Sequence, residues 1–323
     1  MALKVILVCV GCYLAAIATT AEPQSYPSKP IKVIVPAAAG GATDLTARLV
    51  AQKMSERFGQ PVLVENRPGG NEVIGVDAVA KSAPDGYTVV LTPPAAVAIL
   101  PQLQKLPYNV DKDLAPVSLA VVTPLILVVH PSLPAQTVKE LIALAKARPG
   151  HLSYASTGNG TVQHLAGELL KITMKIDLVH IPYKGAGQVM QDLIGGQVPM
   201  FFSGMPPAMP HIRSSKLRAL AVTTSHRSAA APDVPTMEEA GVPGFDISNW
   251  FAYFVPAGTP TDVITKLSAE INRSLKLQDV SEKLAGAGAE AVGTSPEELA
   301  KFLRVESAKF ANLIKASGAK ATD

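Results

Sequence analysis

The feature that most limits the fold of this chain is a unit that occurs three times: a short apolar run, a glycine-containing turn and the start of a helix. The units are Ile31–Asp44, Tyr154–Thr161 and Pro182–Gly187. Backbone N–H groups freed at such a turn and at a helix N-terminus point at one place and favour an anion there. Taken singly, each unit is also compatible with an ordinary strand–helix turn, in which the glycines serve only the backbone geometry of the turn.

Strand-like and helix-like runs alternate along the chain, which predicts an α/β fold. The expected strands span residues 31–35, 61–65, 87–91, 153–156, 178–182, 198–203, 217–223 and 250–256, and the expected helices include 75–82, 137–147, 163–172, 186–194, 261–275 and one that begins at Pro296. This repetition predicts a parallel sheet covered by helices.

Two long apolar passages divide the pattern into two α/β halves. Val121–Val129 leaves the first half and Ile247–Val255 returns to it. We therefore expect lobe 1 to comprise residues 22–122 and 250–323, and lobe 2 to comprise residues 123–249. Two crossings form a hinge, and small ligands bind in the cleft between such lobes.

The first 21 residues have the pattern of a secretory signal peptide. Lys4 precedes an apolar run, and small residues predict cleavage near Ala21. Cys9 and Cys12 fall inside this segment, so the mature chain would carry no thiol, disulfide or cysteine metal site. The net charge of +3 over 323 residues includes no basic run, which argues against nucleic-acid binding. Export without an anchor predicts a periplasmic or secreted protein.

Two of the turns supply most of the candidate ligand-binding residues. The first turn offers Ala38, Gly40, Gly41, Ala42, Thr43 and Asp44, and the second offers Ser156, Thr157, Gly158, Asn159, Gly160 and Thr161, with His164 beyond it. Asp44 could be a general base, but at a helix start an acid is more typical of a cap or dipole partner with a low pKa. The second turn could equally be an N-cap loop that satisfies its own helix.

The third turn and two strand ends complete the candidates. Tyr183 and Lys184 precede a Gly-x-Gly that begins a dinucleotide motif, but Met190 holds the third glycine position. A lysine such as Lys184 is more often solvated than in contact with a ligand. Thr92 with Pro93, and Ser203, follow other strands at positions where cleft residues would lie, although each could be a simple turn.

Enzyme motifs are missing from the sequence. It contains neither a G-x-S-x-G nucleophile elbow nor a P-loop. His164 and Glu168 are one helical turn apart, as metal ligands could be, but no third ligand has motif spacing, which favours an exposed polar pair. We therefore predict no catalytic residue, no metal and no cofactor.

Several further segments match in order the substrate-binding proteins of tripartite tricarboxylate transporters, the Bug or TctC-like receptors, which this chain resembles over almost its whole mature length. The matching segments are residues 26–31, 36–44, 64–69, 83–87, 106–108, 154–160, 180–185, 217–222 and 232–241. The resemblance implies a type II periplasmic binding fold and delivery of the ligand to a membrane permease of one large and one small subunit.

The resemblance also implies the ligand class, which is small carboxylates: di- and tricarboxylates, amino acids or aromatic acids. It implies that residues 38–44 and 156–161 hold carboxylate groups, and that Thr92 and Ser203 shape the pocket. This chain departs from the family pattern at Ala37–Ala39, at the turn of residues 69–72, and at Pro93-Pro94.

The sequence thus predicts an exported, monomeric receptor for a small carboxylate. One alternative is a ligand-responsive periplasmic sensor component that signals to a partner such as a sensor kinase. The other is an exported cleft enzyme of dehydrogenase type that uses the Gly185 turn.

Overall fold

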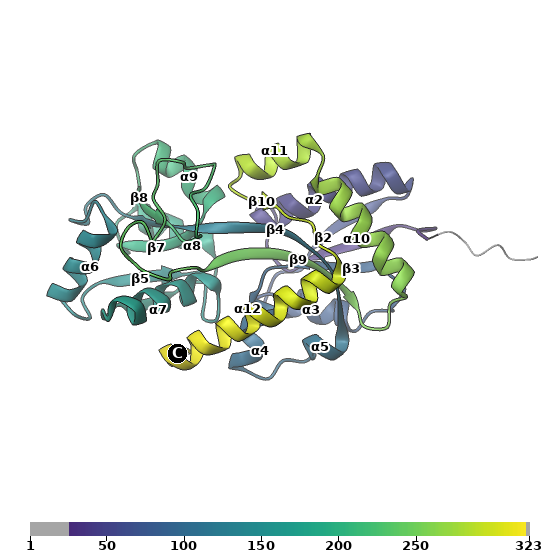
Figure 1. Ribbon diagram of the computed structural model, residues 1–323, viewed down its shortest axis with the longest axis horizontal. Helices are drawn as coiled ribbons and strands as arrows, with labels where there is room; N and C mark the ends of the chain where they lie inside the picture. The colour runs from purple at the N-terminus through teal and green to yellow at the C-terminus, as the bar shows by residue number, and fades with distance from the viewer. Residues whose placement is uncertain (1–25, 321–323) are drawn as a thin grey trace, which may run out of the picture.

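The computed structural model describes residues 26–320. The predicted signal peptide, residues 1–21, lies outside the described residues. Figure 1 shows an elongated molecule with two α/β lobes, which are joined by long strands and bridged by the C-terminal helix.

Lobe 1 is built on three parallel strands in the order β2-β1-β3. They are β1 (Ile31–Val35), β2 (Val62–Asn66) and β3 (Thr88–Thr92), and the main helices around them are α2 (Ala42–Phe58), α3 (Val73–Ala80), α10 (Thr261–Leu275) and α11 (Gln278–Gly286). Helix α2 ends at Gly59, whose φ of 65° closes the helix in a left-handed cap.

Lobe 2 repeats this plan with strands β6, β5 and β7 side by side and parallel. Its strands are β5 (Ser153–Ser156), β6 (Val179–Pro182), β7 (Met200–Gly204) and β8 (Arg218–Val222), and its helices are α6 (Val138–Ala147), α7 (Val162–Met174), α8 (Ala186–Ile194) and α9 (Met205–Arg213).

Two long strands connect the lobes, β4 (Leu114–Val129) and β9 (Ser248–Pro256). Strand β4 pairs with β9 as far as Pro124 and with β7 from Leu125 onward, both antiparallel. The predicted parallel pairing is present within each lobe, but the antiparallel pairs of β4 and β9 make the sheet mixed. Proline has no N–H to donate to a ladder, so the change of partner falls where the ladder is weakest.

The predicted helix that begins at Pro296 is α12 (Pro296–Ser317). It forms a third connection between the lobes, and the sequence did not indicate this role. It begins with the predicted cap at Ser295, completed by Glu298 as a capping box. The helix packs against η1 and α4 on one side and against α7 of lobe 2 on the other (Figure 1). One apolar cluster runs under it through both lobes and includes Leu299 and Phe310.

Several short elements complete the described chain. They are the π-helix η1 (Ala95–Ile99), α4 (Leu100–Leu103), α5 (Val110–Asp113) and β10 (Glu290–Ala291). The sequence did not indicate η1 or α9. All residues of η1 are buried, so it lacks the polar face that gives a helical period. Prolines in the first turn of α9 resemble loop sequence, although that turn needs no N–H donors.

Candidate functional site

The carboxyl ends of the parallel strands in the two lobes face each other. In lobe 1 they lead into residues 36–41, 67–72 and 93–94, and in lobe 2 into residues 157–161, 183–185 and 204. The Asn71 side chain donates a hydrogen bond of 2.9 Å to the carbonyl of Asn159. A second contact lies close by, because a Cβ on Gly160 would come within 2.8 Å of the Leu100 side chain. The loops predicted to bind ligand therefore line opposing edges.

The first loop leaves a helix N-terminus open. Residues 38–41 are exposed, and Gly41 is the N-cap of α2 without a side-chain cap hydrogen bond. The N–H groups of the first helical turn, from Ala42 and Thr43, have no acceptor within their own helix. This arrangement suits an anion at the start of α2.

Asp44 holds this loop in shape. Its carboxylate accepts hydrogen bonds from the Gly40 N–H (3.0 Å), the Arg48 guanidinium (2.9 Å) and the Asn66 amide (3.0 Å). The Asn66 amide also donates to the Ala37 carbonyl. Burial alone would raise the pKa of Asp44, but the hydrogen bonds from Arg48, Gly40 and Asn66 outweigh it, and the pKa lies below its ordinary value. This agrees with the expectation of a helix-start acid with a low pKa.

In the second loop, the hydroxyls serve the loop itself. Ser156 Oγ accepts from the Gly158 N–H at 3.1 Å, and Thr161 Oγ1 donates to the Gly158 carbonyl at 2.7 Å. Thr161 also caps α7, because its Oγ1 accepts from the His164 N–H. Thr157 bonds the Gln163 side chain at 3.3 Å. The alternative of an N-cap loop that satisfies its own helix therefore describes these hydroxyls.

His164 and Glu168 are buried, so the expectation of an exposed polar pair is wrong. The Gly160 N–H donates to His164 Nδ1 at 3.2 Å, and Glu168 accepts from the Tyr154 hydroxyl and Lys171, each at 2.8 Å. Both side chains are thus engaged in the structure of lobe 2. Among residues 26–320, no three histidine, cysteine or acidic side chains gather as a metal site requires.

The third turn presents one exposed cation. Lys184 is exposed, as expected of a surface lysine. The Tyr183 hydroxyl donates to Asp192 on α8 at 2.8 Å, and burial, together with this acceptor, raises the pKa of Tyr183 to about 12. Gly185 begins α8 without a side-chain cap, so a second helix start is open at the same edge as residues 157–161.

The candidate residues at two further strand ends are buried. Thr92 Oγ1 donates to the Pro93 carbonyl at 3.1 Å, and Ser203 Oγ donates to the Gly204 carbonyl at 2.9 Å. These residues support the edges of the sheets rather than present side chains to solvent.

The sequence analysis noted the turn of residues 69–72 only as a departure from the family pattern and did not place Asn71 and Glu72 near the facing edges. Both have positive φ angles, 48° and 79°, in the turn between β2 and α3. A signal was available, because this turn follows a parallel strand next to β1 and therefore emerges at the same edge as the first loop.

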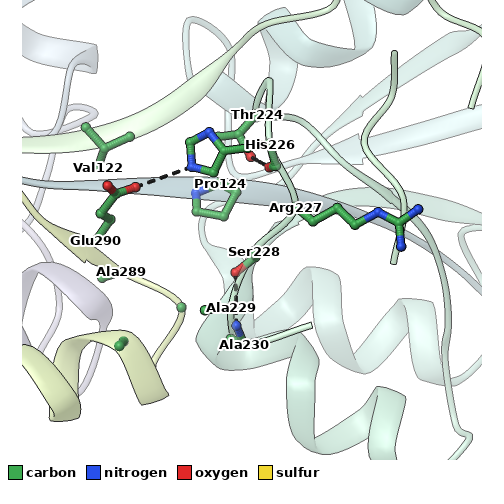
Figure 2. A pocket seen from close by; sticks show the side chains of 12 residues that line it. Val122, Pro124, Thr224, His226, Arg227, Ser228, Ala229, Ala230, Ala289 and Glu290 are labelled. Atoms are coloured by element: carbon green, nitrogen blue, oxygen red, sulfur yellow. Dashed lines mark hydrogen bonds and ion pairs between the residues drawn. The ribbon is translucent and has the colours of Figure 1, made fainter. Parts of the chain in front are cut away.

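A separate cavity of about 290 Å³ lies where the lobes meet on another side, beside β4 and β10 (Figure 2). The His226 ring points toward Glu290, at 3.4 Å, while Arg227 extends away from this pair and bonds Glu239. None of the predicted binding residues lines this cavity.

Comparison with known proteins identifies the relatives of this chain. The family model described as the tripartite tricarboxylate transporter family receptor matches residues 46–319. Protein BugT of Bordetella pertussis is 41% identical over 320 residues, which cover 98% of each chain.

Two solved structures are similar along nearly their whole length. R. palustris Rpa4515 with adipate has a TM-score of 0.86 and 34% identity, with 91% of this chain and 99% of that one covered. MatC from Rhodopseudomonas palustris with bound malate has a TM-score of 0.81 and 32% identity, with 90% of this chain and 100% of that one covered.

No helix within residues 26–320 is long and apolar enough to cross a membrane.

Proposed function

Because the chain belongs to the tripartite tricarboxylate transporter family of receptors, we propose that it captures a small carboxylate in the periplasm and delivers it to a membrane permease of one large and one small subunit. Members of this family are solute-binding receptors and not enzymes, so the dehydrogenase alternative falls away.

The observation that carries the carboxylate proposal is the pair of facing edges with open helix starts. Helices α2 and α8 begin at Gly41 and Gly185 without side-chain caps, one in each lobe. Two relatives whose structures hold adipate and malate support the same ligand class. An anion at these helix starts would accept hydrogen bonds from the N–H groups that have no acceptor within their own helices.

The expected energetics are adequate for a small ligand. Hydrogen bonds to a charged group contribute about 1.5–3 kcal/mol each, and a helix N-terminus contributes about 0.3–1 kcal/mol. Neither glycine loop contains an arginine. We therefore propose that dipoles and N–H groups, closed off from solvent, hold the ligand with a weak dependence on salt.

We further propose which parts of the molecule move and bind. The lobes would be residues 22–122 with 250–323, and residues 123–249, with the hinge in β4 and β9. Contacts to ligand would come from the backbone of residues 38–43 and 157–161 and from the side chains of Tyr183 and Lys184. The signal peptide would direct export and be cleaved near Ala21.

A thermal-shift panel of carboxylic acids, sugars and nucleotides tests the ligand class. A ligand at about 100 times its Kd adds about 2.7 kcal/mol of stability, so a bound acid should raise Tm clearly. Stabilisation by sugars or nucleotides, with none by any acid, would sink the proposal.

Delivery to a permease needs a separate test in cells. Deletion of the gene should abolish uptake of the acid that gives the largest thermal shift, and the intact gene should restore it. Normal uptake with a lost transcriptional response to that acid would instead support the sensor alternative.

A further inference from the structure

The peptide group between Asn159 and Gly160 joins the two lobes. Its carbonyl accepts a hydrogen bond from the Asn71 side chain of lobe 1 at 2.9 Å, and its N–H donates to His164 Nδ1 in lobe 2 at 3.2 Å. The peptide is trans and planar, so its N–H and its carbonyl point in opposite directions. The bond to His164 therefore fixes the direction in which the carbonyl faces lobe 1.

The His164 ring is held firmly in this position. It is 2% exposed, and it stacks on the His180 ring with 4.1 Å between the ring centroids and 11° between the planes. His180 Nε2 lies 2.7 Å from Ser156 Oγ, at the start of the second loop, residues 156–161. The backbone N–H of His164 is bound by the Thr161 hydroxyl. His164 Nδ1 is thus kept against the Gly160 N–H.

This hydrogen bond requires an uncharged His164 ring. A backbone N–H can only donate, so Nδ1 must accept, and the neutral ring then carries its proton at Nε2. A proton on Nδ1 would set two donors against each other and break the bond. Histidine is the side chain whose charge ordinarily changes between pH 5 and 8. The bond from Gly160 is therefore present at neutral pH and is lost as the pH falls.

The other polar groups around the two rings do not ordinarily titrate in this range. Glu168, one turn along α7, accepts from the Tyr154 hydroxyl and pairs with Lys171, each at 2.8 Å. Tyr154 stacks on His180 with 5.0 Å between the centroids. From lobe 1, the side chains nearest to the loop glycine are apolar leucines of α4. Carboxyl, ammonium and phenol groups ordinarily titrate well outside the histidine range. The histidine rings are therefore the pH-responsive groups of this network.

Building on the proposed carboxylate receptor, we propose that His164 is a positioning residue that couples closure of the lobes to pH. The uncharged ring holds the Asn159 carbonyl toward Asn71. The charged ring releases the peptide, and lobe 1 then loses its hydrogen bond to the second loop. The receptor therefore holds its ligand at neutral pH and binds it more weakly at low pH.

Nuclear magnetic resonance tests this proposal in the ligand-free protein. The ring signals of His164 and the amide signal of Gly160 should change together, with one midpoint, as the pH falls from about 8 to 5. In His164→Asn the amide signal should stay nearly constant, because asparagine offers a carbonyl oxygen that cannot titrate in place of Nδ1. His151→Gln, at an exposed histidine of the same lobe, is the matched control and should respond as wild type does. A Gly160 signal that does not follow the His164 ring would overturn the proposal.

Affinity for adipate, measured by titration calorimetry, tests the consequence for binding. Between about pH 7.5 and 5.5, the wild-type affinity should fall about threefold to tenfold more than that of His164→Asn, because up to one hydrogen bond between the lobes is lost. Titration of adipate itself affects both proteins equally. Asn71→Gly should lose the same pH dependence, because the Asn159 carbonyl then has no partner at residue 71, and glycine accepts the positive φ of that residue.

Two results would contradict the coupling. One is an equal pH dependence in wild type and both variants, and the other is a wild-type affinity that rises at low pH relative to His164→Asn. If adipate does not bind, the panel acid with the largest thermal shift takes its place. If no acid binds, the proposed function fails and pH-dependent binding fails with it, whereas the amide signal of Gly160 still decides whether His164 holds the second loop.

Discussion

At the scale of single residues, the two candidate binding loops are shaped by hydrogen bonds to polar groups of the chain itself. Asp44 joins the backbone of Gly40 to Arg48 and Asn66, so the loop before α2 is fixed before any anion arrives. Ser156 and Thr161 do the same for Gly158. A preformed loop loses less conformational entropy on binding, which favours affinity.

Asp44→Asn should weaken binding of a carboxylate ligand and lower stability near neutral pH. Because hydrogen bonds hold the folded pKa of Asp44 below its ordinary value of about 3.9, its contribution is present above that value and is lost as pH falls through the folded pKa. Melting curves across pH should therefore show wild type and variant converging in acid. Asp262→Asn, an exposed first-turn acid on α10, should leave both curves together at every pH. Equal curves for wild type and Asp44→Asn would contradict this account.

Gly158→Ala should reduce ligand affinity more than it reduces stability. The φ of Gly158 is 136°, and a Cβ there would lie 3.1 Å from Asn71 Oδ1, so the added methyl strains the backbone and presses on the contact between the lobes. Gly241→Ala is the control, because its φ of 93° imposes backbone strain but a Cβ there meets nothing within 4 Å. Calorimetric Kd and Tm for both variants separate the two effects. An equal loss of affinity in both would rule out a special role for residue 158.

At the scale of elements, α12 packs against the long strand β4 and is hydrogen-bonded to β9. The Trp250 indole N–H on β9 donates to Glu306 of α12 at 3.1 Å, and Lys309 pairs with the same carboxylate. Trp250 is fully buried, so loss of this acceptor leaves an unsatisfied donor in the core.

Glu306→Ala should therefore lower the free energy of unfolding by about 1–3 kcal/mol, the cost of an unsatisfied buried group. Urea unfolding followed by tryptophan fluorescence measures this directly, because Trp250 is the sole tryptophan of the chain. Glu282→Ala, on the exposed face of α11, should change the same free energy by less than about 0.5 kcal/mol. Similar losses in the two variants would show that the buried indole contact is not what matters.

The elements with a clear period could be predicted, and those without one could not. Strand β1 follows from its apolar, β-branched run, helix α10 from its amphipathic spacing and the cap at Ser295 from capping chemistry. Helix η1 is buried on all sides and α9 carries prolines, so neither has the signal on which prediction depends. The candidate site could also be predicted only in part. The glycine-containing turns indicate which sheet edges carry the candidate loops, but only the fold brings Asn71 into contact with Asn159.

At the scale of the whole molecule, two contacts between the lobes differ in physical character. The Asn71–Asn159 hydrogen bond is itself exposed, but it joins the facing edges beside the buried Gly158 and Gly160. The His226–Glu290 ion pair is about two-thirds exposed on both sides, at 69% and 67%, and lies beside the cavity in Figure 2. Exposed pairs contribute about 0–1 kcal/mol and weaken with salt. Closure of the lobes should therefore depend on the first contact.

Asn71→Gly should weaken ligand binding by up to about tenfold, the equivalent of one hydrogen bond. Glycine removes the side chain while accepting the positive φ of residue 71, so the turn itself should survive. Small-angle X-ray scattering with and without adipate should show a smaller ligand-induced compaction in this variant than in wild type. His226→Ala should compact normally and bind within about twofold of wild type, since its ion pair is exposed. If His226→Ala proves the more harmful change, the ion pair rather than the glycine loop controls closure, and the lobes pivot about the turn of residues 69–72 instead of about β4 and β9.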